Sequence, residues 1–393
     1  MKNYKGIKIE IKPTIEQIEK INKTIGTGRF LYNFYIAYNK EIYEKEKRFV
    51  TGFEFSKYIN NIFIKENPDK SWIKDVSSKS NKQAIMNSEK AFKRFFNKIS
   101  SFPKFKKKSH NNQKCYFFKN NKTDFEFYRH KIKIPTLKFV RLKEYGYIPK
   151  NTNIKSATIS KEGDRYFLSL ILEIKKEIEK NSIQKNLQTK EGIGIDLGIK
   201  DFAICSDGQV FKNINKTFKV RKIEKKLKRE QRKKSRKYLS CKKMEKNLYE
   251  CKNFQKQKLV IAKLFFRLNC IRNDYINKVI NMLTKTKLKY ITIEDLKVSN
   301  MIKNRHLSKT ISQQKFYEFR TKLLNKCKEK NIELRIVSIF YPSSKLCSNC
   351  GHKKQDLKLK DRIYKCCDCG LEIDRDYNAS LNLRNSTQYT ILT

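Results

Sequence analysis

The chain has 393 residues, with 91 Lys and Arg against 39 Asp and Glu, so its formal net charge is +52. A charge this large exceeds what solubility needs and must be neutralised in use, for which polyphosphate is the obvious counter-charge. A membrane surface is the alternative, but basic residues run through the whole chain and no apolar run is long enough to cross a bilayer. The composition therefore favours a nucleic-acid partner, and the 20 Tyr and 26 Phe can serve both cores and base stacking.

The length allows two or three hydrophobic cores. The opening residues lack the apolar core of a signal peptide. Seven of the 11 Cys have no paired spacing, which is typical of reduced thiols in a cytoplasm. We therefore expect a cytoplasmic protein.

The first hundred residues predict one strand and then helices. Residues 5–12 alternate apolar and basic positions, and Pro13 ends this strand. Thr14 to Gln17 has the form of a capping box, which begins an apolar-periodic helix to about Lys47. Further helices are expected over about 53–64 and 79–99. The loop that follows is basic and aromatic, and it is interpreted either as a solvated connector or as a nucleic-acid contact through Lys104 and Lys106.

From Cys115 to Ile174 the apolar period changes to two, and Glu162-Gly163-Asp164 has the composition of a hairpin turn. One strand, a block of helices and then five or six strands predict a small barrel interrupted by a helical insertion. Such barrels often bind oligonucleotides. The expected boundaries are the barrel at 1–12 and 112–174, the helical insertion at 13–111, and a polar linker at 175–191.

After the linker, GIGIDLG predicts a buried strand that carries Asp196 and opens a three-stranded meander. Residues 215–285 are helical and densely basic, with a break expected near Leu239 and Ser240. Because one sign of charge dominates over several turns, phosphate contact is a better interpretation than a solvated face. The candidate contacts are Arg221, Lys228, Arg229, Arg232 and Lys233.

Two more acids complete a set of three. YITIEDL (290–296) predicts a buried strand with Glu294 at its exit, a helix is expected over about 312–330, and Asp376 opens a C-terminal helix. Each acid could be capped or salt-bridged separately, and the pair Asp374-Asp376 alone resembles a helix cap. Convergence is favoured, because burying acids in strands is costly unless something neutralises them. Three such acids suit two Mg²⁺ ions that activate water and stabilise a leaving oxygen.

The order of these elements predicts a ribonuclease-H-like plan over 192–344, completed by the helix and tail at 374–393. Between them, at 345–373, lie two C-x2-C pairs, Cys347 with Cys350 and Cys366 with Cys369, each followed by Gly. Chance thiols in a reducing cytosol are the alternative, but this spacing is typical of a structural zinc ribbon.

The motifs GIDLGIKDFAICSDG, ITIEDLKVSNM, FYPSSKLCSNCG and DRDYNASLN, with the basic helices between them, resemble the TnpB family. This family consists of transposon-encoded RNA-guided nucleases related to compact type V CRISPR effectors. The resemblance implies a split RuvC nuclease whose catalytic acids match Asp196, Glu294 and Asp376, and an N-terminal wedge barrel with a helical recognition insertion. It also implies a guide RNA and a short DNA motif beside the target.

The function expected from this resemblance is RNA-guided cleavage of target DNA beside a short adjacent motif. The expected partners are a guide RNA and target double- and single-stranded DNA, bound by a monomeric protein with one RNA in the prokaryotic cytoplasm, associated with the nucleoid. Expected cofactors are structural Zn²⁺ and two catalytic Mg²⁺ ions. Two alternatives remain open: an RNA-guided DNA-binding regulator without cleavage, and an unguided resolvase or transposase accessory.

Overall fold

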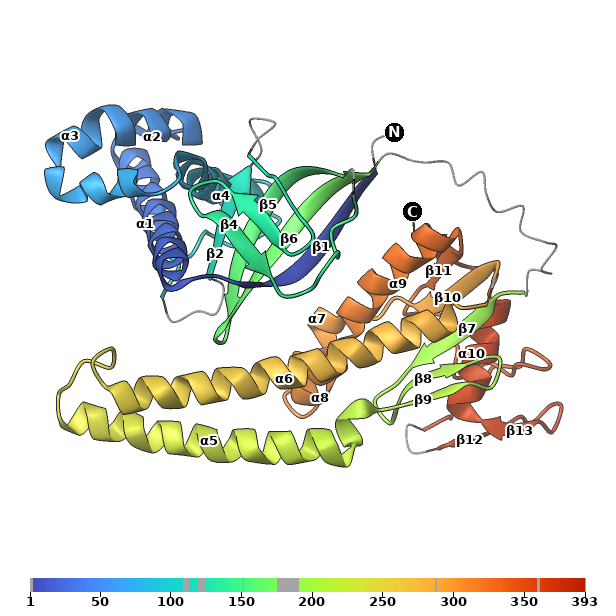
Figure 1. The fold of residues 1–393 in the computed structure, drawn as a ribbon. Helices are drawn as coiled ribbons and strands as arrows, with labels where there is room; N and C mark the ends of the chain where they lie inside the picture. The colour runs from blue at the N-terminus through green and yellow to red at the C-terminus, as the bar shows by residue number, and fades with distance from the viewer. Residues whose placement is uncertain are drawn as a thin grey trace. The chain divides into compact units, whose positions relative to one another are not determined.

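The computed structural model describes residues 3–108, 113–118, 124–150, 152–174, 191–286, 288–358 and 361–392. The chain divides into two compact units, Met1–Lys180 and Asn181–Thr393, and each is described by itself (Figure 1). The division falls inside the predicted linker, of which residues 175–190 lie outside the described residues. In the described parts of the chain, no helix combines the length and apolarity that crossing a bilayer requires.

The first unit contains an antiparallel half-barrel sheet with the strand order β2-β5-β6-β1-β4-β3 (Figure 1). Its strands are β1 (Asn3–Lys12), β2 (Gln113–Phe118), β3 (Lys131–Ile134), β4 (Lys138–Leu142), β5 (Asn153–Glu162) and β6 (Arg165–Ile174). Alternate residues such as Leu168 and Leu170 line its core. The alternating period from Cys115 to Ile174 also predicts a strand at FEFY (125–128), and this prediction is wrong. Phe127 makes only an isolated bridge to Ile132, because a tight turn reverses the chain between them.

The helices of the first unit surround a second, aromatic core that includes Tyr35, Phe55 and Phe92. The predicted capping box begins the first helix, with the Thr14 hydroxyl accepting from the Gln17 N–H at 3.3 Å. The predicted helices are confirmed, and a 3-10 helix at Pro68–Asp75 was not predicted. The elements are α1 (Ile15–Glu46), α2 (Gly52–Tyr58), η1 (Ile59–Phe63), α3 (Ile64–Glu66), η2 (Pro68–Asp75) and α4 (Ser78–Phe96).

The second unit is built on a mixed sheet with the strand order β14-β11-β10-β7-β8-β9. Its central strands β7, β10 and β11 are parallel, and the meander β7-β8-β9 is antiparallel as predicted. The strands are β7 (Ile193–Leu197), β8 (Asp201–Cys205), β9 (Val210–Lys212), β10 (Tyr290–Glu294), β11 (Glu333–Val337) and β14 (Thr390–Ile391). Helices α6 (Lys252–Leu283) and α9 (Phe316–Lys330) cover one face with a shared apolar core.

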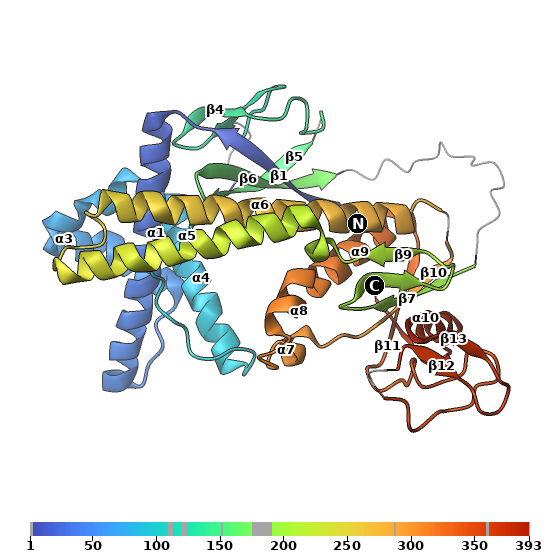
Figure 2. The same cartoon turned by 90° about the horizontal axis from the view of Figure 1, so that it is seen from below.

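The basic segment forms a hairpin of two long helices, α5 (Phe218–Lys243) and α6, which lie side by side in both views (Figure 2). The break expected near Leu239 and Ser240 is wrong, because neither residue stops a helix. Helix α5 ends at Lys243 with Met244 as its C-cap, and Glu245 adopts a positive φ of 49° in the turn to α6.

The helix expected over 312–330 is two helices, α8 (Ser308–Gln314) and α9, preceded by α7 (Val298–Met301). They are separated at Lys315, which has a φ of 58° and whose ammonium group contacts Asn273 and Glu318. This change of direction lets Ile311 and Phe316, on either side of it, both enter the core.

The C-terminal helix α10 (Arg375–Asn385) lies directly against β7 (Figures 1 and 2). The close approach requires Gly194, since a Cβ there would lie 2.1 Å from the Ser380 carbonyl oxygen and 2.4 Å from the Arg384 nitrogen. The ribbon strands β12 (Ile363–Lys365) and β13 (Glu372–Asp374) pair immediately before this helix.

Candidate functional site

Two of the predicted acids lie at one level of the mixed sheet. In the parallel pair β7 and β10, Ile195 lies beside Ile293, so the next residues, Asp196 and Glu294, follow on neighbouring strands. Side chains alternate between the two faces of a strand. Since both isoleucines enter the helix-covered core, the two carboxylates point to the opposite face, the one on which α10 packs.

The third acid comes from the first turn of α10. Asp374 is the N-cap, because its carboxylate accepts two backbone N–H bonds of that turn at 3.0 Å each. This leaves Asp376 available for another role. In the same way Asp295 pairs with Arg320, whereas the side chain of its neighbour Glu294 points to the sheet face on which α10 packs. Asp374 and Asp295, the acids close in sequence to two of the candidates, therefore have structural roles of their own.

The charges of the other two acids act on Asp196. Burial, followed by the charges of Glu294 and Asp376, raises the pKa of Asp196 to about 8, while Arg375 acts in the opposite direction. Burial also raises the pKa of Glu294, against a hydrogen bond from Ser343. A raised carboxyl pKa reports negative charge without enough compensation. The face between β7, β10 and α10 therefore favours a cation.

Sequence reasoning missed the groups that orient these acids. The Ser343 hydroxyl donates to the Glu294 carboxylate, and Asn382 of α10 donates to the Ser343 carbonyl at 2.7 Å. Arg375 holds the Asp376 carboxylate at 3.0 Å. The serine and asparagine lie in FYPSS and NASLN, and neither motif by itself reveals the distant partner of its hydrogen bond.

The acids fit Mg²⁺ in donor type, because hard cations take carboxylate oxygens. Among the described residues, their oxygens do not gather within the 4.8 Å that encloses a ready-made ligand set. A cation bound by all three acids would therefore have to draw their carboxylates together.

A pH dependence follows from the raised pKa of Asp196. The folded state holds this proton more tightly than the unfolded state, so its stabilising effect is full below about pH 4 and is lost as pH rises to about 8. In magnesium-free buffer, Asp196→Asn should gain stability over the parent chain between pH 5 and 8, by on the order of 2 to 4 kcal/mol. Urea unfolding of both chains measures this, and parallel stability–pH curves would contradict it.

The predicted zinc ligands form a second site. The sulfurs of Cys347, Cys350, Cys366 and Cys369 all lie within 4.8 Å of one another, and two of their separations are 3.5 Å. Tetrahedral zinc with 2.3 Å bonds places sulfurs about 3.8 Å apart, so the four thiols fit this ion closely. Gly351 and Gly370 have φ values of 78° and 72°, as the turn after each pair requires.

The predicted contacts on α5 face solvent. Arg221, Lys228, Arg229, Arg232 and Lys233 are all exposed, whereas Val220, Ile223 and Leu227 pack on α6. The helix has 14 Lys and Arg against two Glu. Both glutamates are engaged, Glu224 with Arg272 at 2.8 Å and Glu230 with Lys233 at 3.0 Å. The outer face therefore keeps a large excess of positive charge.

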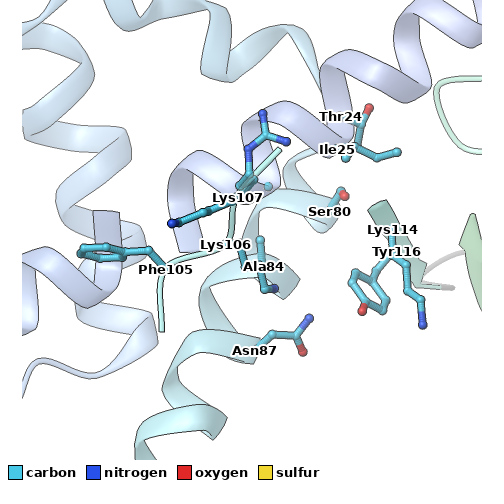
Figure 3. A pocket seen from close by; sticks show the side chains of 12 residues that line it. Thr24, Ile25, Ser80, Ala84, Asn87, Phe105, Lys106, Lys107, Lys114 and Tyr116 are labelled. Carbon is cyan, nitrogen blue, oxygen red and sulfur yellow. The ribbon is translucent and has the colours of Figure 1, made fainter. Parts of the chain in front are cut away.

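In the first unit, the predicted basic loop borders a pocket of about 330 Å³ (Figure 3). Lys106 and Lys107 line it with Arg29, Lys114 and Tyr116. The Lys106 ammonium lies 3.6 Å from the centre of the Tyr32 ring, and desolvation there lowers its pKa. Lys104 is exposed and does not line the pocket. The other lining residues, such as Arg29 and Tyr116, lie far from the loop in sequence, so no local pattern predicts that they share a pocket with it.

Three family models match the chain in order: a helix-turn-helix domain at 1–48, the probable transposase OrfB_IS605 at 172–305, and the Cas12f1-like TNB domain at 316–383. The putative RNA-guided DNA endonuclease InsQ of Escherichia coli K12 is 28% identical over 98% of this chain and 92% of its own. The chain is therefore similar over nearly its whole length to a relative of the TnpB family. Residues 3–48 form a strand and one helix, despite the name of the model that matches them.

Two further comparisons extend this similarity, one in sequence and one in fold. A putative RNA-guided DNA endonuclease of Streptomyces pristinaespiralis is 27% identical over 96% of this chain and 88% of its own. A solved structure, a Cas12f1–sgRNA–target DNA complex, matches with a TM-score of 0.57 at 15% identity, covering 98% of this chain and 99% of that one. The structural likeness shows that the fold is shared.

Proposed function

We propose that the chain is a transposon-associated RNA-guided DNA endonuclease that cleaves its target beside a short adjacent motif. The observation that carries the proposal is the convergence of Asp196, Glu294 and Asp376 from three separate elements on one face of the mixed sheet. Similarity over nearly the whole chain to two putative RNA-guided DNA endonucleases supports the same activity.

The three acids are the catalytic residues in this proposal. When bound there, two Mg²⁺ ions would supply an activated water and stabilise the leaving oxygen of an in-line phosphodiester hydrolysis. Ser343 fixes the orientation of Glu294, and Arg375 holds Asp376 until a cation competes for it. The strand order, with the helical hairpin between β9 and β10, supports a ribonuclease-H-like, RuvC-type domain over 192–344 and 374–393.

The remaining parts receive roles that follow the same plan. The half-barrel sheet supports a wedge domain at 1–12 and 112–174, and residues 13–111 form its helical recognition insertion. The ribbon at 345–373 holds zinc through its four cysteines. The partners are one guide RNA and the target DNA, bound by a monomer in the prokaryotic nucleoid. Base pairing then reads the sequence, while protein reads duplex shape and the adjacent motif.

Sequencing of RNA that co-purifies with the chain, followed by cleavage of a DNA complementary to its guide segment in Mg²⁺, tests the proposal. A discrete RNA and guide-dependent cutting are expected. Binding without cutting would instead favour an RNA-guided regulator, and cutting without RNA would favour an unguided nuclease. Retention of all three acids, in a face whose charge favours a cation, supports the endonuclease.

The exposed face of α5 is proposed to follow the backbone of the guide–target duplex. In an A-form duplex the bases are already paired, so such a surface reads charge and geometry. Changing Lys228, Arg229, Arg232 and Lys233 together to Gln should weaken target binding about equally for unrelated guides. The log–log salt dependence should flatten by up to about 0.9 for each phosphate contact removed. Binding over a salt series with two guides measures both effects.

A matched control removes the same four charges from the first unit, at Lys40, Lys45, Lys47 and Arg48. Three of these residues have a glutamate within 4 Å, so local acids offset much of their charge. The control should leave the salt slope close to that of the parent chain. An unchanged slope in the α5 variant, or a loss confined to one guide, would refute the assignment.

A further inference from the structure

A second cluster of metal-ligating side chains lies on the ribbon, outside the four-cysteine set. It consists of His352, Cys367 and Asp368, called here the outer cluster, whose ligand atoms lie within 4.8 Å of one another. Cys367 and Asp368 occupy the two positions between the zinc ligands of the second pair, and His352 follows the first pair. The outer cluster therefore joins the two halves of the ribbon a second time.

The histidine of the outer cluster is held in place by the ribbon itself. The carbonyl of His352 accepts from the Cys347 N–H at 2.9 Å and from the Tyr364 hydroxyl at 3.2 Å, and Tyr364 is fully buried. The His352 N–H donates to the Cys350 sulfur. The backbone position of this histidine is thus fixed by the same contacts that form the four-cysteine site.

The hydrogen bonds of the outer cluster set the role of each ring nitrogen. Nδ1 of His352 lies 2.7 Å from a carboxylate oxygen of Asp368, and Nε2 lies 3.2 Å from the sulfur of Cys367. In the neutral ring, the Nδ1–H group donates a hydrogen bond to the carboxylate. The unprotonated Nε2 then points its lone pair toward the thiol. Histidines that bind metals usually donate a hydrogen bond from their other ring nitrogen to a carboxylate, carbonyl or water, which orients the imidazole. Asp368 is placed to do this for His352.

The distance between the two donor atoms suits a zinc-sized ion. With bonds of 2.3 Å to sulfur and about 2.0 Å to nitrogen, tetrahedral zinc separates these donors by about 3.5 Å. Sulfur and nitrogen are now 3.2 Å apart, so a widening of about 0.3 Å would admit the ion. The cation takes the place of the thiol proton, which leaves to solvent.

We propose that the outer cluster is a second transition-metal site that binds Zn²⁺. Cys367 and His352 supply the soft and borderline donors that select zinc over Mg²⁺. Asp368 orients the imidazole, and water completes the coordination. With two direct protein ligands instead of four, on a face where the cysteine and aspartate are exposed, the site is weaker than the four-cysteine site and fills after it. The site does not depend on the nuclease function.

Zinc content after equilibrium dialysis of the full-length chain tests this site. At nanomolar free zinc, one ion per chain is expected, and at low micromolar free zinc two. Cys367→Ser and His352→Ala should each keep the first ion and lose the second. Asp368→Asn should weaken the second site by about 10- to 100-fold, as removal of an orienting carboxylate does.

Cys270→Ser is the matched control, because it removes another exposed thiol remote in sequence from the ribbon. It should retain both ions. A parent chain that saturates at one zinc, or a Cys367→Ser chain that still binds two, would overturn the proposal. Loss of both ions from Cys367→Ser would also overturn it, since Cys367 would then be a ligand of the first zinc. Titration with Co²⁺ gives an independent check, through thiolate charge-transfer absorption that Cys367→Ser lacks at the second step.

Discussion

Alanine at any one of Asp196, Glu294 and Asp376 is expected to lower cleavage of target DNA by about three orders of magnitude or more, since groups that act as a unit fail together. Guide and target binding should change less than about threefold, because in the proposed mechanism these carboxylates hold cations and contact no base. Single-turnover cleavage in Mg²⁺ and binding in its absence measure the two quantities separately.

The chain offers matched controls for this experiment in the adjacent acids. Asp295 pairs with Arg320, and Asp374 caps α10. Asp295→Asn and Asp374→Ser, the second of which preserves a capping oxygen, should therefore cut at close to the parental rate. Full cleavage by any of the three alanine variants would show that the proposed catalytic set is wrong.

The second large effect is expected from the four-cysteine site. Cys347→Ser or Cys366→Ser should release the structural zinc and destabilise the C-terminal third of the chain, because such a site supplies folding free energy directly. Cleavage should fall by about 100-fold or more, since the ribbon precedes the helix that carries Asp376. Zinc content, proteolysis of the C-terminal third and cleavage are the measurements.

The loss of cleavage has a structural route. Asn378 and Asn382 of α10 donate to the Leu346 carbonyl at 2.6 and 2.8 Å, and the Ser348 N–H donates back to Asn378 at 3.0 Å. The first cysteine pair thus docks on the helix of the third acid. Cys367→Ser is the control and should keep one zinc and most of its activity. Equal loss of the structural zinc from Cys366→Ser and Cys367→Ser would show that the ligand is misassigned.

Much of this site could be predicted from sequence, since its signals are local. An acid inside an apolar strand, such as Asp196, differs from its neighbours and is easily recognised. The spacing of paired cysteines by itself indicates a zinc site. Helix boundaries with a side-chain cap, such as Thr14, were likewise predictable. In each case the deciding residues lie within one turn or one strand of each other.

The features that sequence did not predict depend on contacts between distant segments. Asp196 lies beside Glu294 because of the register of β7 and β10, which pairs residues almost a hundred positions apart. The break at Lys315 reflects demands of the core and of Asn273. Likewise, Ser343 becomes important only through its partner Glu294, and nothing in its own neighbourhood reveals that hydrogen bond.

The close contact of α10 with β7 depends on the absence of a side chain at Gly194, and this contact sets the distance between two of the proposed catalytic carboxylates. Asp196 lies two residues along the strand from this contact, and Asp376 lies one turn along the helix from Ser380. A side chain at 194 would act as a wedge and separate the acids without removing either. Genetic intolerance at this position would therefore match that of a catalytic residue, although the position contributes only proximity and no chemistry.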